Sequence, residues 1–132
     1  MENLLNNITP ILILLLLAVT FLQSGIDKIT DWSGNISWLK EHFAKTYIKK
    51  FVVIAVVKLL ILEIIAGLLC VAGIYILITN GENSVGLYGA ILSCIVLLVL
   101  LLGQRIAKDY DGARTIVIYF IPAVFCVYLL AN

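Results

Sequence analysis

The feature that most constrains this chain is one carboxylate inside a long apolar segment. Glu63 lies near the middle of Phe51–Thr79, where Lys58 is the only other charged residue. A run of this length can cross a hydrocarbon core of about 30 Å as one helix. A charge at the centre of a membrane costs roughly 2.5–3.5 kcal/mol even on lenient scales, so it persists only when paired, protonated or functional. The sequence therefore predicts a membrane protein with one polar site inside it.

The composition supports a membrane protein. Hydrophobic residues make up 63% of the chain and charged residues 13%, against roughly 45–50% and 25% in ordinary soluble domains. A soluble domain of 132 residues has too little interior to bury that much apolar surface, so lipid must cover part of it. The net charge of +1 argues against nucleic acid as a partner.

We expect an all-α, integral membrane four-helix bundle that forms a single transmembrane domain over residues 1–132. The predicted spans cover residues 8–29, 51–79, 85–104 and 115–131. Asn80–Ser84 contains an Asn-Gly pair and predicts a tight turn between the second and third spans. Met1–Thr9 has no Lys or Arg and no good cleavage site follows the first apolar run, so we expect that run to be a retained helix.

The distribution of basic residues predicts the orientation. Eight lie between spans one and two or between spans three and four, and the N-terminus, the second loop and the C-terminus have none. These eight are Lys28, Lys40, Lys45, Lys49, Lys50, Arg105, Lys108 and Arg114. The excess favours cytoplasmic first and third loops with both termini outside.

The first loop contains a second amphipathic pattern. Apolar residues recur at helical spacing at Ile36, Leu39, Phe43 and Tyr47, with charges on the other faces. This predicts a short interfacial helix over about residues 35–47. Its role is either a packed anchoring connection or a lid or docking surface over the cytoplasmic mouth of the bundle.

Small residues predict how the spans pack. Ala66, Gly67 and Cys70 share a stripe with Glu63, and span three carries Gly86, Gly89, Ala90 and Ser93 on one face. Small side chains form contact surfaces between membrane helices, so Glu63 should face protein. The candidate intramembrane polar site comprises Glu63, Lys58 and Tyr119, although Lys58 lies about 140° round the helix from Glu63.

Tyr119, a backbone carbonyl or a group on another subunit are the partners expected for Glu63. Without a cation beside it, burial would keep this acid protonated near neutral pH. Its role is either functional or a structural hydrogen bond between helices. A second polar cluster, either a solvated rim or a cytoplasmic entrance for a proton or a quinone head group, comprises Gln23, Ser24, Asp27, Lys28, Gln104 and Arg105.

Several chemistries lack their residues. His42 is the only histidine, and there is no phosphate-binding loop or metalloprotease motif. We therefore expect no catalytic residues, no metal and no cofactor held by this chain alone, which leaves enzymatic activity uncertain. Cys70, Cys94 and Cys126 lie in three different spans; they serve either as packing residues or, for Cys70 and Cys94, as a disulfide-exchanging pair.

Phe21–Lys28 (FLQSGIDK), Glu63–Gly73 (EIIAGLLCVAG) and four spans in about 130 residues resemble the DoxX-like family of small bacterial membrane proteins. The resemblance implies a four-helix accessory subunit linked to quinol or thiol redox chemistry. It would map a glycine-lysine turn onto Gly25 and Lys28, and an intramembrane acid onto Glu63.

Two functions follow. The first is a multi-pass subunit of a larger, redox- or quinone-linked complex in the bacterial inner membrane, not catalytic alone, with a quinone at a subunit interface. The second is a small proton-coupled carrier that uses Glu63. The expected partners are the lipid bilayer and other membrane subunits, with no nucleic acid.

The orientation can be tested by labelling engineered cysteines. We expect an impermeant thiol reagent added outside to label a cysteine in Asn80–Ser84 and to leave Lys108→Cys unlabelled, because the basic loops should face the cytoplasm. Labelling of intact cells before and after permeabilisation measures this. Strong external labelling of Lys108→Cys would reverse the orientation.

Overall fold

The computed structural model describes residues 2–46 and 51–132, and every regular element in these residues is a helix. In chain order the helices are α1 (Glu2–Asn6), α2 (Ile8–Thr30), α3 (Trp32–His42), α4 (Val52–Thr79), α5 (Ser84–Ile106) and α6 (Tyr110–Ala131). Four of them, α2, α4, α5 and α6, are long and apolar enough to cross a membrane. The all-α expectation is confirmed, and the four helices have the length and composition of a multi-pass membrane protein.

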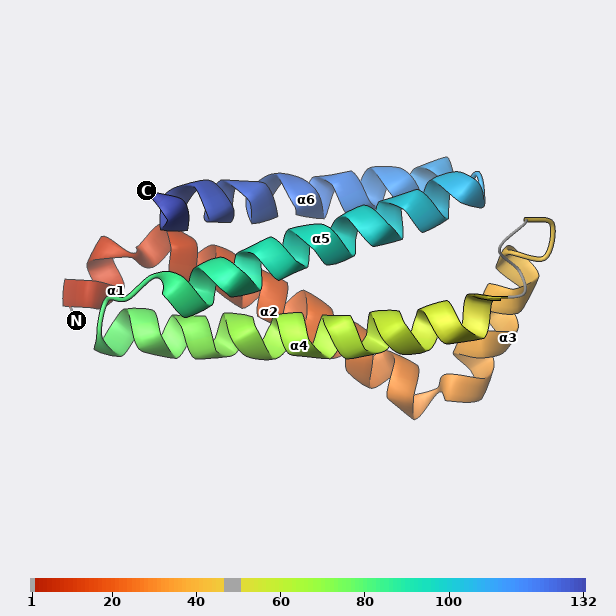
Figure 1. The fold of residues 1–132 in the computed structure, drawn as a ribbon, viewed down its shortest axis with the longest axis horizontal. Coiled ribbons are helices and arrows are strands. Elements are labelled where there is room, and N and C mark those ends of the chain that lie inside the picture. The colour runs from red at the N-terminus through yellow and green to blue at the C-terminus, as the bar shows by residue number, and fades with distance from the viewer. Residues whose placement is uncertain (1, 47–50) are drawn as a thin grey trace.

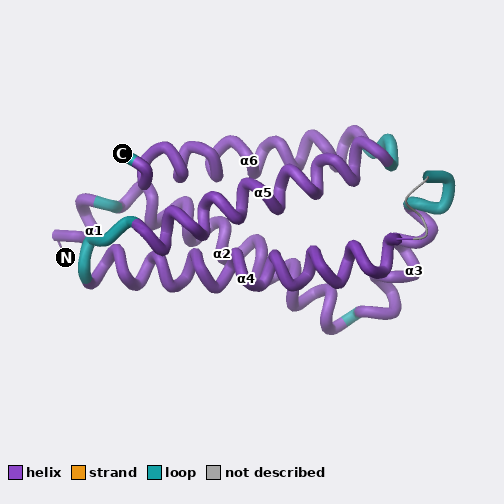
Figure 2. The backbone as a smooth tube through the Cα atoms, in the orientation of Figure 1, coloured by secondary structure: helices purple, strands orange, loops and turns teal. Residues whose placement is uncertain are grey.

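The four long helices run alternately up and down (Figure 1). The α4–α5 turn and both chain termini lie at one end, and α3 and the α5–α6 turn lie at the other, which we call the α3 end (Figure 2). Packing is extensive between α2 and α4, α4 and α5, and α5 and α6, but much sparser between α2 and α6. The bundle therefore has one weakly packed seam, between α2 and α6.

Two helices begin at residues that the sequence pattern did not indicate. A helix is present between α2 and α4, but it covers Trp32–His42 and not the predicted residues 35–47. The predicted end, Tyr47, lies outside the described residues. The fourth long helix begins at Tyr110 instead of residue 115. Asp109 explains the earlier start, because its Oδ1 accepts a hydrogen bond of 3.0 Å from the Gly112 N–H and so caps the helix.

Close backbone approach holds α4 against α5. A side chain at Gly73 would collide with the backbone of Gly86, and a side chain at Gly89 would lie 3.0 Å from the backbone nitrogen of Cys70. The predicted contact between these small-residue stripes is therefore present. Ser93 and Cys70 are fully buried at the same contact. Dispersion and close packing, rather than a hydrophobic drive, hold such helices together in lipid.

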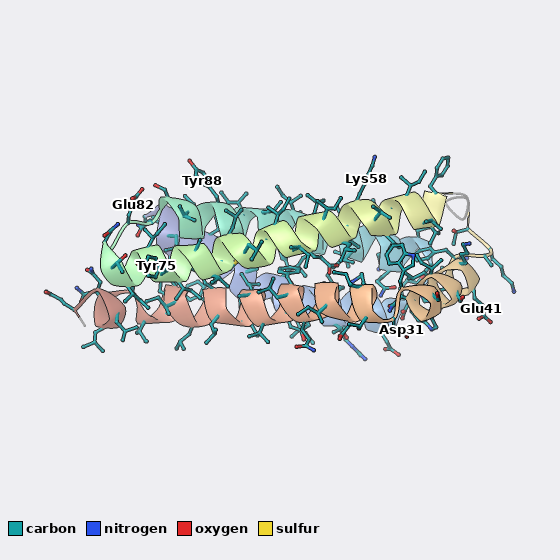
Figure 3. All side chains as sticks on the ribbon, turned by 90° about the horizontal axis from the view of Figure 1, so that it is seen from below. Asp31, Glu41, Lys58, Tyr75, Glu82 and Tyr88 are labelled. Carbon is teal, nitrogen blue, oxygen red and sulfur yellow. The ribbon has the colours of Figure 1, made fainter. Side chains whose placement is uncertain are left out.

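The outer surface of the bundle changes along its length. Exposed leucine, isoleucine and valine side chains cover the long helices, while tyrosines project near the end that carries the termini: Tyr75, Tyr88 and Tyr128. Figure 3 shows the first two pointing outward. Trp38 and Tyr110 are exposed at the α3 end. Aromatic residues at both ends of an apolar band are typical of proteins that span a membrane.

The glycine contact generates a prediction. Gly73→Ala should lower the thermal unfolding midpoint of the purified protein, by the equivalent of about 1–3 kcal/mol, because the new methyl group forces α4 away from α5. Gly103→Ala on α5 is the matched control: its methyl group would meet only Phe43, at 3.8 Å, so helix propensity should keep or raise stability. Circular dichroism melts in detergent measure both. Equal effects of the two substitutions would contradict the close contact.

Candidate functional site

The most buried charge in the described part of the chain is Glu63, whose side chain is 1% exposed. Its two carboxylate oxygens lie 3.2 and 3.1 Å from the Nζ atom of Lys28. The ammonium group also donates a hydrogen bond of 2.7 Å to the Ser24 hydroxyl. The Lys28 ammonium group thus bridges both carboxylate oxygens of Glu63 and the hydroxyl of Ser24, which lies one turn earlier on α2.

The local sequence explains why these side chains meet. Gly25 lies against Ile64 and Leu60, and Gly67 lies against Leu22, so two glycines let α2 and α4 pack closely on either side of Glu63. Lys28 lies in the last turn of α2 and is 15% exposed at its side chain. The long alkyl chain of a lysine can therefore cover apolar surface while its ammonium group reaches the acid.

Two expectations about Glu63 need correction. Lys58, placed in the candidate polar site, is exposed on the outer face of α4 and points away from the bundle (Figure 3), as its position 140° round the helix requires. Tyr119, one of the three expected hydrogen-bond partners, does not bond to Glu63 in the described structure. The acid faces the bundle interior as predicted, but its partner is the cation Lys28, assigned from the sequence only to the rim.

The depth of the ion pair follows from the position of each residue along its helix. The residue lies midway along α4, but it is level with Lys28 in the last turn of α2. Measured from the end that carries the termini, helical rise puts Lys28 about 30 Å and Glu63 about 24 Å along the bundle. Because α4 is about 42 Å long, Glu63 also lies about 16 Å from the α3 end of that helix. The ion pair therefore lies between the middle of the bundle and the α3 end. Counting residues from the end that carries the termini places the two side chains within about 6 Å of each other along the bundle, which is the signal for Lys28 in the sequence.

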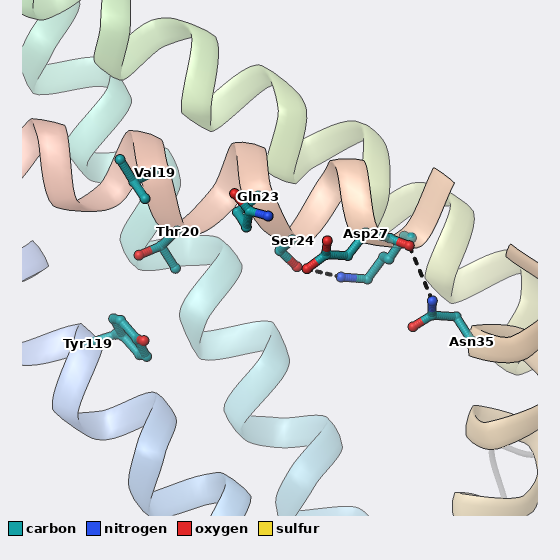
Figure 4. Close-up of a pocket in the computed structure, with 8 residues that line it drawn as sticks. Val19, Thr20, Gln23, Ser24, Asp27, Asn35 and Tyr119 are labelled. Atoms are coloured by element: carbon teal, nitrogen blue, oxygen red, sulfur yellow. Dashed lines mark hydrogen bonds between the residues drawn. The ribbon is translucent and has the colours of Figure 1, made fainter. Parts of the chain in front are cut away.

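A polar pocket of about 470 Å³ lies beside the ion pair at the α2–α6 seam. It is lined by Val19, Thr20, Gln23, Ser24, Asp27 and Lys28 from α2, Asn35 from α3 and Tyr119 from α6. Figure 4 shows Tyr119 on α6 facing the polar residues of α2 across the seam. Asn35 donates a hydrogen bond of 3.4 Å to the carbonyl of Asp27, which ties α3 to the pocket. The pocket exists because α2 and α6 pack sparsely.

The structure divides the predicted cytoplasmic entrance into separate groups. Its four α2 residues, Gln23, Ser24, Asp27 and Lys28, line the pocket. Gln104 instead contacts His42 of α3, with 3.4 Å between its Oε1 and the imidazole Nε2. Arg105 lies over the ring of Tyr110, 5.1 Å from its centroid, and lines a different pocket. Sequence proximity to a helix end did not reveal which side of the bundle each residue faces.

The cysteine, histidine and acidic side chains of the described residues do not form a second polar site in the interior. All three cysteines are buried: Cys70 Sγ lies 3.7 Å from the Ser93 hydroxyl, and Cys126 Sγ lies 3.9 Å from the Pro10 carbonyl oxygen. Among residues 2–46 and 51–132, no three histidine, cysteine or acidic side chains are grouped as metal ligands would be. The polar chemistry of the interior is thus concentrated at the ion pair and its neighbouring pocket.

No protein-family model matches this chain, and searches of curated proteins and of solved structures find no match either. The DoxX-like resemblance therefore stays a prediction.

The ion pair predicts a specific pattern of stability. Lys28→Met and Glu63→Leu should each lower the unfolding midpoint, by the equivalent of about 3 kcal/mol, because each leaves its partner buried without a counter-charge. The double variant should recover most of the loss, since two apolar side chains need no pairing. Thermal melts in detergent test this.

Lys58→Met is the matched control, because Lys58 is exposed on α4, and it should leave the midpoint unchanged. Additive losses in the double variant would show that Lys28 and Glu63 act independently.

Proposed function

We propose that this protein is a small multi-pass subunit of a larger, redox- or quinone-linked membrane assembly, not catalytic by itself, and that the α2–α6 pocket binds the head group of a quinone. The observation that carries the proposal is the polar pocket beside the Lys28–Glu63 pair, at the seam where two apolar helices separate. A ligand with an apolar tail and a polar ring suits such a site.

The pocket residues offer the hydrogen bonds that a quinone needs. Gln23 and Tyr119 make no side-chain hydrogen bond within residues 2–46 and 51–132, so both groups are free to donate to a quinone carbonyl. Lys28 also lines the pocket. The carboxylate of Asp27 can accept a hydrogen bond from the hydroxyl of a reduced quinol.

The membrane placement in this proposal is the bacterial inner membrane with both termini outside. The basic residues of the described chain gather toward the α3 end, whereas Glu2 and Glu82 lie at the other end. Cytoplasmic loops carry the excess of lysine and arginine, which puts α3 on the cytoplasmic side. There α3 lies in the interface beside the pocket, to which it contributes Asn35.

A proton-coupled carrier is the second candidate, and the burial of Glu63 favours it. Lys28 lines the pocket and separates it from Glu63, which does not line it. A carrier cycle would have to separate the pair so that Glu63 can take up and release a proton. Ionisable groups at such depth are typical of proton pathways.

Purification from native membranes in mild detergent tests the proposal. We expect stoichiometric partner subunits and a co-extracted quinone, identified by mass spectrometry and by chromatography of the lipid extract. A variant with Gln23→Leu and Tyr119→Phe should retain about 30-fold less quinone, because two hydrogen bonds of roughly 1 kcal/mol each are lost without a change of charge. Tyr128→Phe, on the same helix but outside the pocket, should behave as the wild type.

The two candidates give opposite results in this experiment. A chain that purifies alone and without quinone, and that catalyses a proton-coupled flux abolished by Glu63→Gln, would replace the subunit proposal with the carrier. Unchanged quinone content in the double variant would remove the pocket from the proposal.

A further inference from the structure

A second pocket, of about 430 Å³, lies between α5 and α6 near the turn that joins them. Its apolar lining consists of Leu101, Ala113 and Val117. Arg105 from the last turn of α5, and Tyr110 and Arg114 from the start of α6, supply the rest of the lining. Two cations thus line one partly apolar groove at the point where α5 ends and α6 begins.

The two guanidinium groups are held in different ways. Arg105 lies 5.1 Å above the ring of Tyr110, a cation–π contact that restrains it beside the groove. Arg114 donates a hydrogen bond of 2.8 Å to the carboxylate of Asp111, and both side chains are largely exposed. An exposed ion pair of this kind contributes little to stability, so Arg114 can exchange Asp111 for a stronger anion without disturbing the fold.

We propose that this α5–α6 groove is a binding site for an anionic phospholipid. The phosphate of the head group binds between Arg105 and Arg114, and one acyl chain lies along Leu101, Ala113 and Val117. Arginine pairs with phosphate through two parallel hydrogen bonds, and basic residues at the membrane surface attract anionic lipids. The site is separate from the quinone pocket and does not depend on the proposed function.

The shape and charge of the groove select this occupant. A free phosphate would satisfy the arginines but leave the apolar lining uncovered, whereas a lipid without net charge would cover that lining but add no negative charge beside Arg105 and Arg114. The groove opens at the level where α5 ends and α6 begins, which is the level of lipid head groups when both helices span the membrane. An anionic phospholipid matches both parts of the lining.

Native mass spectrometry of the full chain tests the site. In detergent with added phosphatidylglycerol, the wild type should retain one lipid molecule per chain, and with phosphatidylcholine, whose choline cation offsets its phosphate, it should retain at least fivefold less. Arg105→Gln and Arg114→Gln should each reduce retention about fivefold, and together about 25-fold. Asp111→Asn should increase retention, because it frees Arg114 from its competing carboxylate.

Two further variants separate a seated lipid from general attraction. Lys40→Gln with Lys45→Gln removes the same two charges from exposed positions in and just after α3 and should leave retention unchanged. Val117→Trp, at a partly exposed position of the groove, keeps the charge but fills the place of the acyl chain, and it should reduce retention at least fivefold. Circular dichroism confirms that each variant keeps its helix content.

Three results would overturn the proposal. The first is undiminished retention by the double arginine variant. The second is an equal loss in the Lys40 and Lys45 variant, which would show attraction to the whole basic end. The third is displacement of the lipid by millimolar inorganic phosphate, with Val117→Trp unaffected, which would identify an anion site without a lipid.

Discussion

The Lys28–Glu63 pair is the interaction on which the rest of this bundle depends. A carboxylate that is 1% exposed tolerates burial only with a counter-charge and hydrogen bonds around it. Lys28 supplies the charge from α2, and Ser24 fixes the ammonium group from the same helix. The pair therefore specifies the register of α2 against α4, since sliding either helix by a turn would separate the charges. Gly25 and Gly67 permit the close approach that this register requires.

The position of the pair also shapes the pocket. Because Lys28 turns toward α4, the α2 face toward α6 carries polar residues rather than a packing surface, and α2 and α6 contact each other sparsely. Helix α2 thus packs closely against α4 around the ion pair and only sparsely against α6. A site for an amphiphilic ligand arises at the open seam, with α3 covering its end through Asn35.

The two ends of the molecule differ in chemistry as well as in charge. At the α3 end, His42 of α3 lies 3.7 Å from Asp109 and 3.4 Å from Gln104, so polar contacts connect α3 to the α5–α6 turn. Asp109 also caps α6 through the Gly112 N–H. This end therefore holds the polar pocket and the arginine-lined groove, and the ion pair lies between it and the middle of the bundle. The opposite end is closed by short connections and carries outward tyrosines.

The sequence by itself determined the all-helical class, four apolar spans, the inward direction of Glu63 and the small-residue contact surfaces. Each follows from local composition or from helical period, which a single segment reveals. The tertiary structure decided which groups meet. Lys28, and not Tyr119 or Lys58, pairs with Glu63. Gln104 contacts His42 and Arg105 lines the α5–α6 groove, so neither lies with the polar residues of α2. Those outcomes depend on the axial offset and rotation of one helix against another, which are set by side-chain packing between segments distant in sequence, so no single segment encodes them.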